Sequence, residues 1–367
     1  MAGLYVHIPF CVRKCNYCDF YSVPGKLTLL DRYVEAVLLE AEQYHGTHFD
    51  TLYIGGGTPS LLGAGRLEIL MQGLSQQMGL VSLREATIEV NPESASDEFL
   101  KTARSLGFDR VSIGVQSLSD EELAKSGRIH DARTAVAAID GARHCGFSNI
   151  SADIIVGLPG QTDRMLSNTL AGLGGLGITH LSMYCLSIEE NTPFSADRPP
   201  DLVDDEGQAI LFEHAAEHLM DEGFIHYEIS NFALPGRECL HNLNYWRGGE
   251  YIGLGPSAAS HIAGVRSKNA SCLEAYIENP LDGECEREAL GPDDKMAEEA
   301  ILRLRLLAEG LELAVLQERH PVADISGLKE RLDKMVGEGM LAVDGGRYRL
   351  PEGGVMTSNR VFVRVLN

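Results

Sequence analysis

Short apolar runs alternate with amphipathic segments along the first half of the chain. Residues 29–45 and 64–78 carry apolar side chains at helical spacing and predict two helices. Six runs rich in β-branched and aromatic residues predict strands, at residues 5–8, 52–54, 86–90, 110–115, 150–156 and 179–186. Strands that alternate with helices predict an α/β fold with a parallel sheet, either open and doubly wound or barrel-like. The pattern does not choose between these two.

A weak internal repeat supports this interpretation. Four segments share a glycine, a large apolar residue, two mostly polar residues and a β-rich run, and they begin at Gly107, Gly146, Gly177 and Gly223. Each glycine follows an amphipathic segment and is expected to end a helix in the left-handed conformation. The repeats are 39, 31 and 46 residues apart, which is the size of one strand–helix unit.

The pattern changes after about residue 190. A helix is expected near 204–222, followed by a strand and a polar-aromatic segment, His241-Asn-Leu-Asn-Tyr-Trp246. Three helices and a hairpin with an Asp-Gly-Gly turn then predict a winged-helix-like module, at residues 293–308, 312–319, 326–338 and 341–350. We therefore predict a main domain, a β-containing extension and a C-terminal module, at residues 1–222, 223–290 and 291–367.

Composition and charge exclude some classes of protein. The chain has 367 residues, of which 44% are hydrophobic and 23% charged, and its net charge is −22. Such an acidic chain is not expected to bind nucleic acid or to dock electrostatically on an anionic membrane. No apolar run approaches the ~20 residues of a membrane span. The chain begins with a predicted strand and without signal-peptide features, so we expect a cytoplasmic protein with no membrane insertion.

Polar residues recur where the predicted strands end. Glu89 lies near the end of one strand and is followed by Asn91, Gln116 follows the next strand, and Asp153 precedes a glycine-rich turn. Both candidate architectures place their chemistry at the carboxyl ends of parallel strands. Any one of these residues is as consistent with an ordinary loop, but their recurrence in successive units predicts a site.

Three cysteines near the start of the chain predict a metal cluster. Cys11, Cys15 and Cys18 have C-x3-C-x2-C spacing, so one loop can present three thiolates. Three ligands for a four-iron cluster leave one iron open to a substrate. A zinc site needs a fourth ligand, and within the next twenty residues there is none, while His7 lies upstream. A ferredoxin-like site also uses four cysteines for each cubane.

The cysteine loop and the glycine turn at residues 55–57 together resemble the radical S-adenosylmethionine (SAM) superfamily. The match extends over essentially the whole chain, through Gly55-Gly-Gly-Thr-Pro59, Glu89-Val-Asn-Pro92, Ser112-Ile-Gly-Val-Gln116, Arg128-x-His130, Asp153 and Gly157-Leu-Pro-Gly160. The resemblance implies a partial (β/α)6 barrel of the TIM type. It also implies that the three cysteines hold a [4Fe–4S] cluster, that SAM binds the open iron, and that one electron then cleaves SAM to methionine and a 5′-deoxyadenosyl radical.

The same resemblance assigns residues to SAM. Amide groups of Gly56 and Gly57 are expected to approach its methionine end closely, because no side chains stand in the way. By position in the motifs, the other expected contacts are Tyr5, Tyr17, Thr58, Glu89, Gln116, Arg128 and Asp153. A guanidinium suits the methionine carboxylate, and a carboxylate suits ribose hydroxyls. His7 and His130 are expected to support the site structurally.

Within the superfamily, the chain resembles oxygen-independent coproporphyrinogen III dehydrogenases and, more closely, their HemW-type relatives. The dehydrogenases carry a further cysteine two places after the last ligand, where this chain has Phe20. They also carry an N-terminal extension, which we do not expect here because Tyr5 stands four residues from the start. The HemW resemblance rests on an H-N-x-x-Y-W motif, formed by His241, Asn242, Tyr245 and Trp246.

This finer resemblance implies a chaperone that binds heme and delivers it to membrane proteins of respiration, with a separate electron donor for the cluster. The alternative is a dehydrogenase that decarboxylates porphyrinogen propionates to vinyl groups. The four motif residues are candidate heme contacts, with Cys239 as a rival to His241 for the iron. They are equally consistent with a buried structural cluster of hydrogen bonds.

Overall fold

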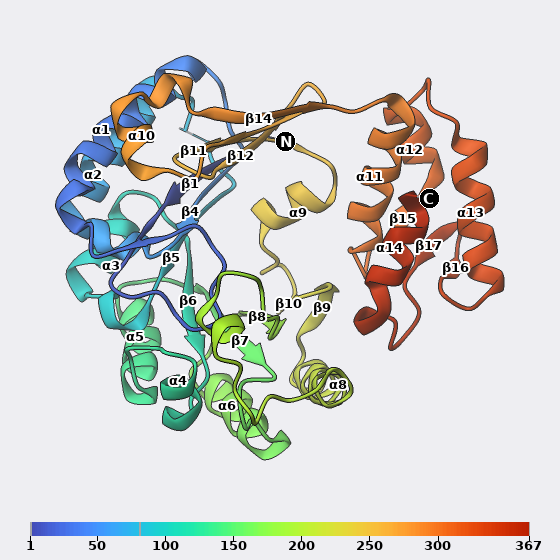
Figure 1. Cartoon of the computed structure of the whole chain (residues 1–367), viewed down its shortest axis with the longest axis horizontal. Coiled ribbons are helices and arrows are strands. Elements are labelled where there is room, and N and C mark those ends of the chain that lie inside the picture. Colours follow the sequence, from blue (N-terminus) through green and yellow to red (C-terminus); the bar gives the residue numbers. More distant parts are fainter. Residues whose placement is uncertain (1, 81, 367) are drawn as a thin grey trace.

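The computed structural model describes residues 2–80 and 82–366. Within these residues, a twelve-stranded sheet curves around an open centre (Figure 1). Its middle consists of parallel neighbours in chain order, β1 (Ala2–Ile8), β4 (Thr51–Gly56), β5 (Glu85–Val90), β6 (Arg110–Gln116), β7 (Asn149–Val156) and β8 (His180–Cys185). All six predicted strands are therefore present, and the sheet forms the expected partial barrel instead of an open, doubly wound sheet.

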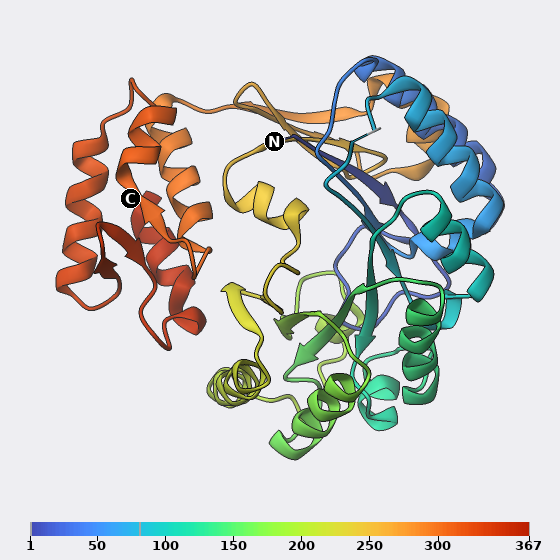
Figure 2. The same ribbon diagram turned by 180° about the vertical axis from the view of Figure 1, so that it is seen from behind.

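Helices cover the outer face of this curve, as Figure 2 shows from behind. They are α1 (Leu30–Ala41), α2 (Gly63–Gln77), α3 (Asp97–Ser105), α4 (Asp120–Lys125), α5 (Ala132–His144), α6 (Asp163–Gly175) and α8 (Asp205–Asp221). Side chains of Ser96, Asp131 and Thr162 cap three of them by accepting an N–H bond from the first turn. The apolar residues between helices and sheet, such as Val6 and Ile54, are fully buried.

The edges of the sheet contain further strands, and among them the sequence predicts only the one at residues 225–228. Strand β11 (Glu250–Leu254) pairs in parallel with β1. The next three are antiparallel, β12 (Ala259–Ile262), β13 (Val265–Asn269) and β14 (Glu284–Ala289). At the other edge are β9 (Ile225–Glu228) and β10 (Asn231–Ala233). Every residue of β14 is exposed, so it lacks the alternation that marks a half-buried strand.

The polar-aromatic segment forms helix α9 (Leu240–Trp246), which closes the amino end of the barrel. The carboxylate of Glu85, the first residue of β5, accepts the N–H groups of Leu240 and His241, both at 3.0 Å. At the start of β4, Thr51 Oγ1 lies 2.8 Å from His241 Nδ1. The carboxyl ends of the strands, where SAM residues are expected, lie at the opposite end.

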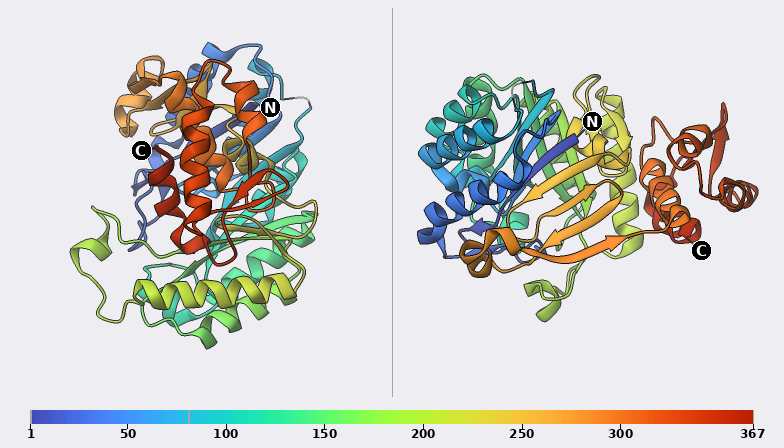
Figure 3. Two further views of the ribbon diagram at one scale, coloured as in Figure 1. Left: turned by 90° about the vertical axis from the view of Figure 1, so that its right-hand side faces the viewer. Right: turned by 90° about the horizontal axis from the view of Figure 1, so that it is seen from above.

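The C-terminal module has its own core and lies beside the barrel, reached through β14 (Figure 3). It contains α11 (Pro292–Leu304), α12 (Leu313–Arg319), α13 (Ile325–Gly337), α14 (Ser358–Leu366) and a small sheet of β15 (Leu311–Glu312), β16 (Ala342–Asp344) and β17 (Arg347–Arg349). The three predicted helices and the hairpin are present. The final helix α14 was not predicted, although Val361, Phe362 and Val365 are buried at helical spacing.

A buried carboxylate orients the arginine through which this module contacts the turn after α9. Glu299 on α11 accepts hydrogen bonds from Arg303 Nε at 2.7 Å and Arg319 Nε at 2.8 Å, and lies 2.9 Å from His320 Nε2. Arg319 also donates to the backbone oxygen of Gly248, at 2.7 Å. The bonds to the two arginines and His320 outweigh burial and hold the pKa of Glu299 below its ordinary value.

Replacing Glu299 with alanine is expected to lower the free energy of unfolding by about 3 kcal/mol, because it leaves Arg303, whose side chain is only 13% exposed, without its carboxylate partner. Arg319, at 44% exposed, adds little to this cost. The matched control is Glu312→Ala, which breaks a half-exposed pair with Arg347 in the same module and should cost less than ~1 kcal/mol. Denaturant unfolding measures both. Equal effects of the two substitutions would contradict the inferred importance of the buried pair.

Candidate functional site

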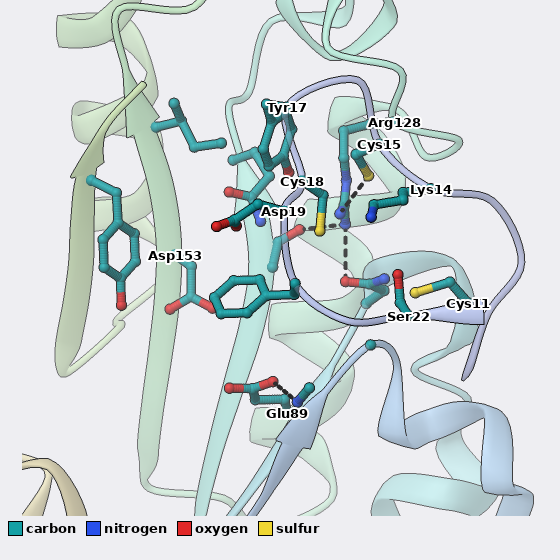
Figure 4. Close-up of a pocket in the computed structure, with 18 of the residues that line it drawn as sticks. Cys11, Lys14, Cys15, Tyr17, Cys18, Asp19, Ser22, Glu89, Arg128 and Asp153 are labelled. Atoms are coloured by element: carbon teal, nitrogen blue, oxygen red, sulfur yellow. Dashed lines mark hydrogen bonds between the residues drawn. The ribbon is translucent and has the colours of Figure 1, made fainter. Parts of the chain in front are cut away.

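Most of the predicted site residues line one cavity at the carboxyl ends of the strands. This cluster cavity has a volume of about 370 Å³. Of the predicted residues, its wall contains Cys11, Cys15, Cys18, Tyr17, Gly56, Gly57, Glu89, Gln116, Arg128 and Asp153. Figure 4 shows the cysteine loop on one side, with Glu89 and Asp153 reaching the cavity from the strands.

A chain of polar contacts connects two of the cysteines across the cavity wall. Thr58 Oγ1 lies 3.5 Å from Cys11 Sγ and accepts a hydrogen bond from Asn91 Nδ2 at 3.0 Å. Arg128 donates to Asn91 Oδ1 at 3.0 Å and to Cys15 Sγ at 3.5 Å. The Nε of Arg128 is buried and bonds no described residue. The guanidinium thus retains a buried donor for a further acceptor.

The three thiols suit a cluster better than a single ion. Among the described residues, no group of three or more His, Cys, Asp or Glu side chains is gathered closely enough to hold one metal ion. In a cubane each thiolate binds a different iron, so the sulfurs need not converge on one point. Burial raises the pKa of Cys11, and it raises that of Cys18 to about 11. These thiols therefore lose their protons when metal binds, not before.

The glycine turn brings backbone close to the cysteine loop. Gly56 has φ +114°, and a Cβ on Gly57 would lie 2.6 Å from the Phe10 carbonyl oxygen and 3.1 Å from Cys11 Sγ. Gly56 donates its N–H to Glu89 Oε2 at 3.0 Å, and Gly57 donates to the Ile8 carbonyl at 2.8 Å. Both amides are thus already bonded within the protein. The turn therefore lets a cofactor approach the backbone closely, but its two N–H groups are not free to donate to that cofactor.

Two carboxylates face the cavity from β5 and β7, the strands on either side of β6. Burial raises the pKa of Glu89 to about 7, and the charge of the nearby Asp153 raises it further. Hydrogen bonds from Tyr53 and Gly56 act in the opposite direction and lower it. Tyr53 donates to Glu89 Oε1 at 2.6 Å. Burial also raises the pKa of Asp153, which accepts a hydrogen bond from Ser112 at 3.0 Å. A cation in the cavity would favour the charged form of both groups.

Gln116 lies on the same wall in a strained conformation. Its backbone φ is +65°, which residues other than glycine rarely adopt. The pairing of β6 with β7 shifts register just before this residue. Such strain is usually retained where it positions a functional group. No pattern in the sequence indicates it.

Glu89→Gln is expected to stabilise the cofactor-free protein more at about pH 8 than at about pH 5. Because the folded-state pKa of Glu89, about 7, is above the unfolded value of about 4.3, the folded protein holds this proton more tightly. The protonated Glu89 therefore adds to the free energy of unfolding at acid pH, and this contribution is lost as the pH rises through 7. Glutamine does not titrate. Urea unfolding at both pH values measures the difference, and a pH-independent difference would refute this assignment.

Several predicted residues lie away from the cluster cavity. Thr58 is buried behind its wall. A second cavity, of about 640 Å³, has an aromatic wall that includes the predicted residues Tyr5, Tyr245 and Trp246. The full wall of this aromatic cavity consists of Tyr5, His7, Phe20, Tyr21, Tyr245, Trp246, Gly248, Gly249, Tyr251, Ser257, Ala259, His261, Arg266, Glu298, Ile301, Leu302 and Leu366. His241 and Asn242 do not line either cavity. His241 is 1% exposed, and burial lowers its pKa to about 3.

Several residues of the site were not singled out as contacts from the sequence, among them Tyr184, Cys185 and Phe20. Tyr184 and Cys185 end β8 and line the cluster cavity. Only their position at a strand end, shared with Glu89 and Gln116, could have indicated them. Phe20 is 66% exposed and lies on the walls of both cavities, so the two adjoin at this ring.

A curved parallel sheet with three cysteines and a glycine turn at its carboxyl edge defines a radical SAM protein. The family model of the Radical SAM superfamily matches residues 5–171, and that of the HemN C-terminal domain matches residues 290–357. Superfamily membership implies SAM and a [4Fe–4S] cluster. The cavity fits both groups, with its three thiols, its close backbone approach and the buried donor of Arg128.

Curated relatives narrow this class. The chain is 32% identical to the heme chaperone HemW of Lactococcus lactis subsp. lactis, over 99% of this chain and 96% of that protein. It is 34% identical to the heme chaperone HemW of Escherichia coli, over 98% and 97% of the two chains. The chain belongs to the HemW family.

The fold agrees with a solved relative. The structure of the coproporphyrinogen III oxidase HemN from Escherichia coli matches with a TM-score of 0.86 at 24% identity, covering 99% of this chain and 89% of that one. This confirms the partial barrel. In residues 2–80 and 82–366, no helix has both the length and the apolar character needed to cross a membrane.

Proposed function

We propose that this protein is a heme chaperone that carries a SAM-coordinated [4Fe–4S] cluster and delivers heme to membrane proteins of respiration. The observation that supports the proposal is the identity to curated heme chaperones over nearly the whole chain. Phe20 agrees with it, because a non-ligating cysteine is expected there in the dehydrogenases. We also propose that the protein acts in the cytoplasm.

In this proposal the cluster cavity binds the cofactors. Cys11, Cys15 and Cys18 hold the cluster, and Arg128 pairs with the SAM carboxylate through its guanidinium. Asp153 accepts from the ribose hydroxyls. The other proposed contacts on the cavity wall are Tyr17, Gly56, Gly57, Glu89 and Gln116. Tyr5 and Thr58 lie away from this wall and are proposed as contacts from the motifs alone. When bound, the reduced cluster supplies the electron for SAM cleavage, and an external donor must provide that electron.

One anaerobic preparation tests the proposal against its rival. The reconstituted protein is titrated with heme, and in parallel it is incubated with SAM, a reductant and coproporphyrinogen III. A chaperone retains heme stoichiometrically and forms no protoporphyrinogen IX. Catalytic formation of that product would instead identify an oxygen-independent coproporphyrinogen III dehydrogenase, the activity that the shared HemN fold also permits.

The domain boundaries remain our proposal. The radical SAM barrel spans 1–222, the extension with the His241–Trp246 segment spans 223–290, and the C-terminal module spans 291–367. Strands of the extension continue the barrel sheet, so we expect the first two units to unfold together. The C-terminal module, with a separate core, is the unit that we expect to separate first.

A further inference from the structure

The aromatic cavity is lined by residues of the sheet, of α9 and of the C-terminal module, so it lies between the sheet and that module. Figure 1 shows these elements on either side of the open centre. Its volume of about 640 Å³ is within the ~300–1,000 Å³ range of small-molecule sites. Rings and aliphatic chains dominate its wall, contributed by Tyr5, Tyr245, Trp246, Tyr251, Ile301 and Leu302. Such side chains suit a flat, mostly apolar macrocycle.

Two imidazoles lie on this wall, and one of them is fully engaged. His7 Nδ1 lies 3.0 Å from the Tyr5 hydroxyl, and its Nε2 lies 2.9 Å from the backbone oxygen of Tyr21. Its side chain is 5% exposed. A metal could reach either nitrogen only after one of these bonds breaks.

The other imidazole, His261, has a free nitrogen. It lies on β12, opposite Tyr251 of β11 in the strand register. Its Nδ1 is 3.4 Å from the backbone oxygen of Gly249, a long hydrogen bond. A carbonyl only accepts, so Nδ1 is the donor in this bond, and a neutral imidazole then has its lone pair on Nε2. Among the described residues, none bonds Nε2. Metal-binding histidines are commonly oriented in this way, with the second nitrogen on a carbonyl.

The histidine of the H-N-x-x-Y-W motif is in the opposite situation. His241 lies at the amino end of the barrel, with Nδ1 2.8 Å from Thr51 Oγ1 and Nε2 2.8 Å from the Tyr245 hydroxyl. Both nitrogens are occupied by partners inside the fold. The bond to Tyr245 fixes a ring that does line the aromatic cavity, so His241 acts on the cavity through that ring.

We propose that heme binds in the aromatic cavity with Nε2 of His261 as an axial ligand of its iron, and that His241 is a positioning residue. This inference rests on the proposed heme cargo. The one arginine among the lining residues, Arg266, is already bonded to Glu288 and Glu298. Retention of heme therefore depends mainly on ring packing and on the iron–imidazole bond.

The test is an anaerobic heme titration of the cluster-loaded protein, read as the absorption difference spectrum and as the heme retained after gel filtration. His261→Ala should lose the spectrum of imidazole-ligated heme and bind at least about tenfold more weakly. Added imidazole should restore that spectrum. Ala259→Trp, which fills the cavity beside an intact His261, should also reduce heme retention.

A positioning variant and a control complete the test. His241→Asn loses the bond to the Tyr245 hydroxyl, so it should weaken heme retention and keep the ligation spectrum of the wild type. His214→Ala removes a half-exposed histidine of α8, far from the cavity in sequence and paired with Asp163, and should leave heme binding unchanged. Circular dichroism and cluster absorption establish that each variant is folded.

The outcomes separate this inference from the proposed function. If the wild type does not retain heme, the proposed function fails, and this inference fails with it. If the wild type retains heme and His261→Ala keeps the wild-type spectrum and affinity, only the assignment of His261 is refuted. Loss of ligation in folded His241→Asn, with His261→Ala unaffected, would transfer the ligand to His241.

Discussion

Replacing Cys11, Cys15 or Cys18 with alanine is expected to abolish the visible charge-transfer absorption of the reconstituted iron–sulfur protein and to reduce its iron content to background. Each thiolate of the loop binds a different iron of the proposed cluster, and the other residues of the cavity wall include no histidine that could take its place. Iron and sulfide analysis, together with the absorption spectrum, measures the effect.

Two other cysteines make this test specific. Cys185 lies on the wall of the same cavity but outside the loop, and burial raises the pKa of its thiol to about 11. Cys285 is exposed on β14. Cys185→Ala and Cys285→Ala should retain full iron content. Loss of the cluster in Cys185→Ala would show that Cys185 is a ligand. Retention of the cluster in a variant of Cys11, Cys15 or Cys18 would show that the replaced cysteine is not a ligand.

Gly57→Ala is expected to weaken SAM binding at least about tenfold and to destabilise the fold by ~1–3 kcal/mol. A methyl group there would lie 2.6 Å from the Phe10 carbonyl oxygen and 3.0 Å from that of Ile8. Both atoms belong to backbone, which cannot rotate away as a side chain can. The segment that carries Cys11 would have to move, and the cavity wall would move with it.

The matched control is Gly65→Ala. Gly65 is in α2, and outside the backbone of its own helix no described atom lies within 4 Å of the position that a methyl group would take there. Alanine should stabilise this helix by up to ~1 kcal/mol. Equilibrium dialysis of SAM and thermal unfolding under anaerobic conditions compare the two variants. If Gly57→Ala binds SAM as tightly as Gly65→Ala does, the close approach at residue 57 has no bearing on the cofactor.

Much of the site could be predicted because its chemistry is local in sequence. Eight residues hold all three cysteines, so their proximity needs no knowledge of the fold. The polar residues at strand ends, such as Glu89, Gln116 and Asp153, were expected to converge because parallel neighbours share one edge of a sheet. The structure places these residues on one cavity.

Other features could not be predicted because their residues carry no local pattern. Strand β14 is exposed on both faces, and the strain at Gln116 arises from the register of β6 against β7. The contacts of His241 with Thr51 and Glu85 span about 150 to 190 residues. No periodicity of apolar positions specifies a contact of that range.

By itself, the sequence determined the parallel strand–helix order, the cysteine loop, the glycine turn and the resemblance to radical SAM proteins. Only the tertiary structure decided which end of the barrel each group occupies. Curvature of the sheet places α9 at the amino ends of the strands, where both nitrogens of His241 are bonded. The same curvature leaves an open side that the C-terminal module faces. There His261, without any motif around it, is one of the residues that line a cavity of aromatic rings.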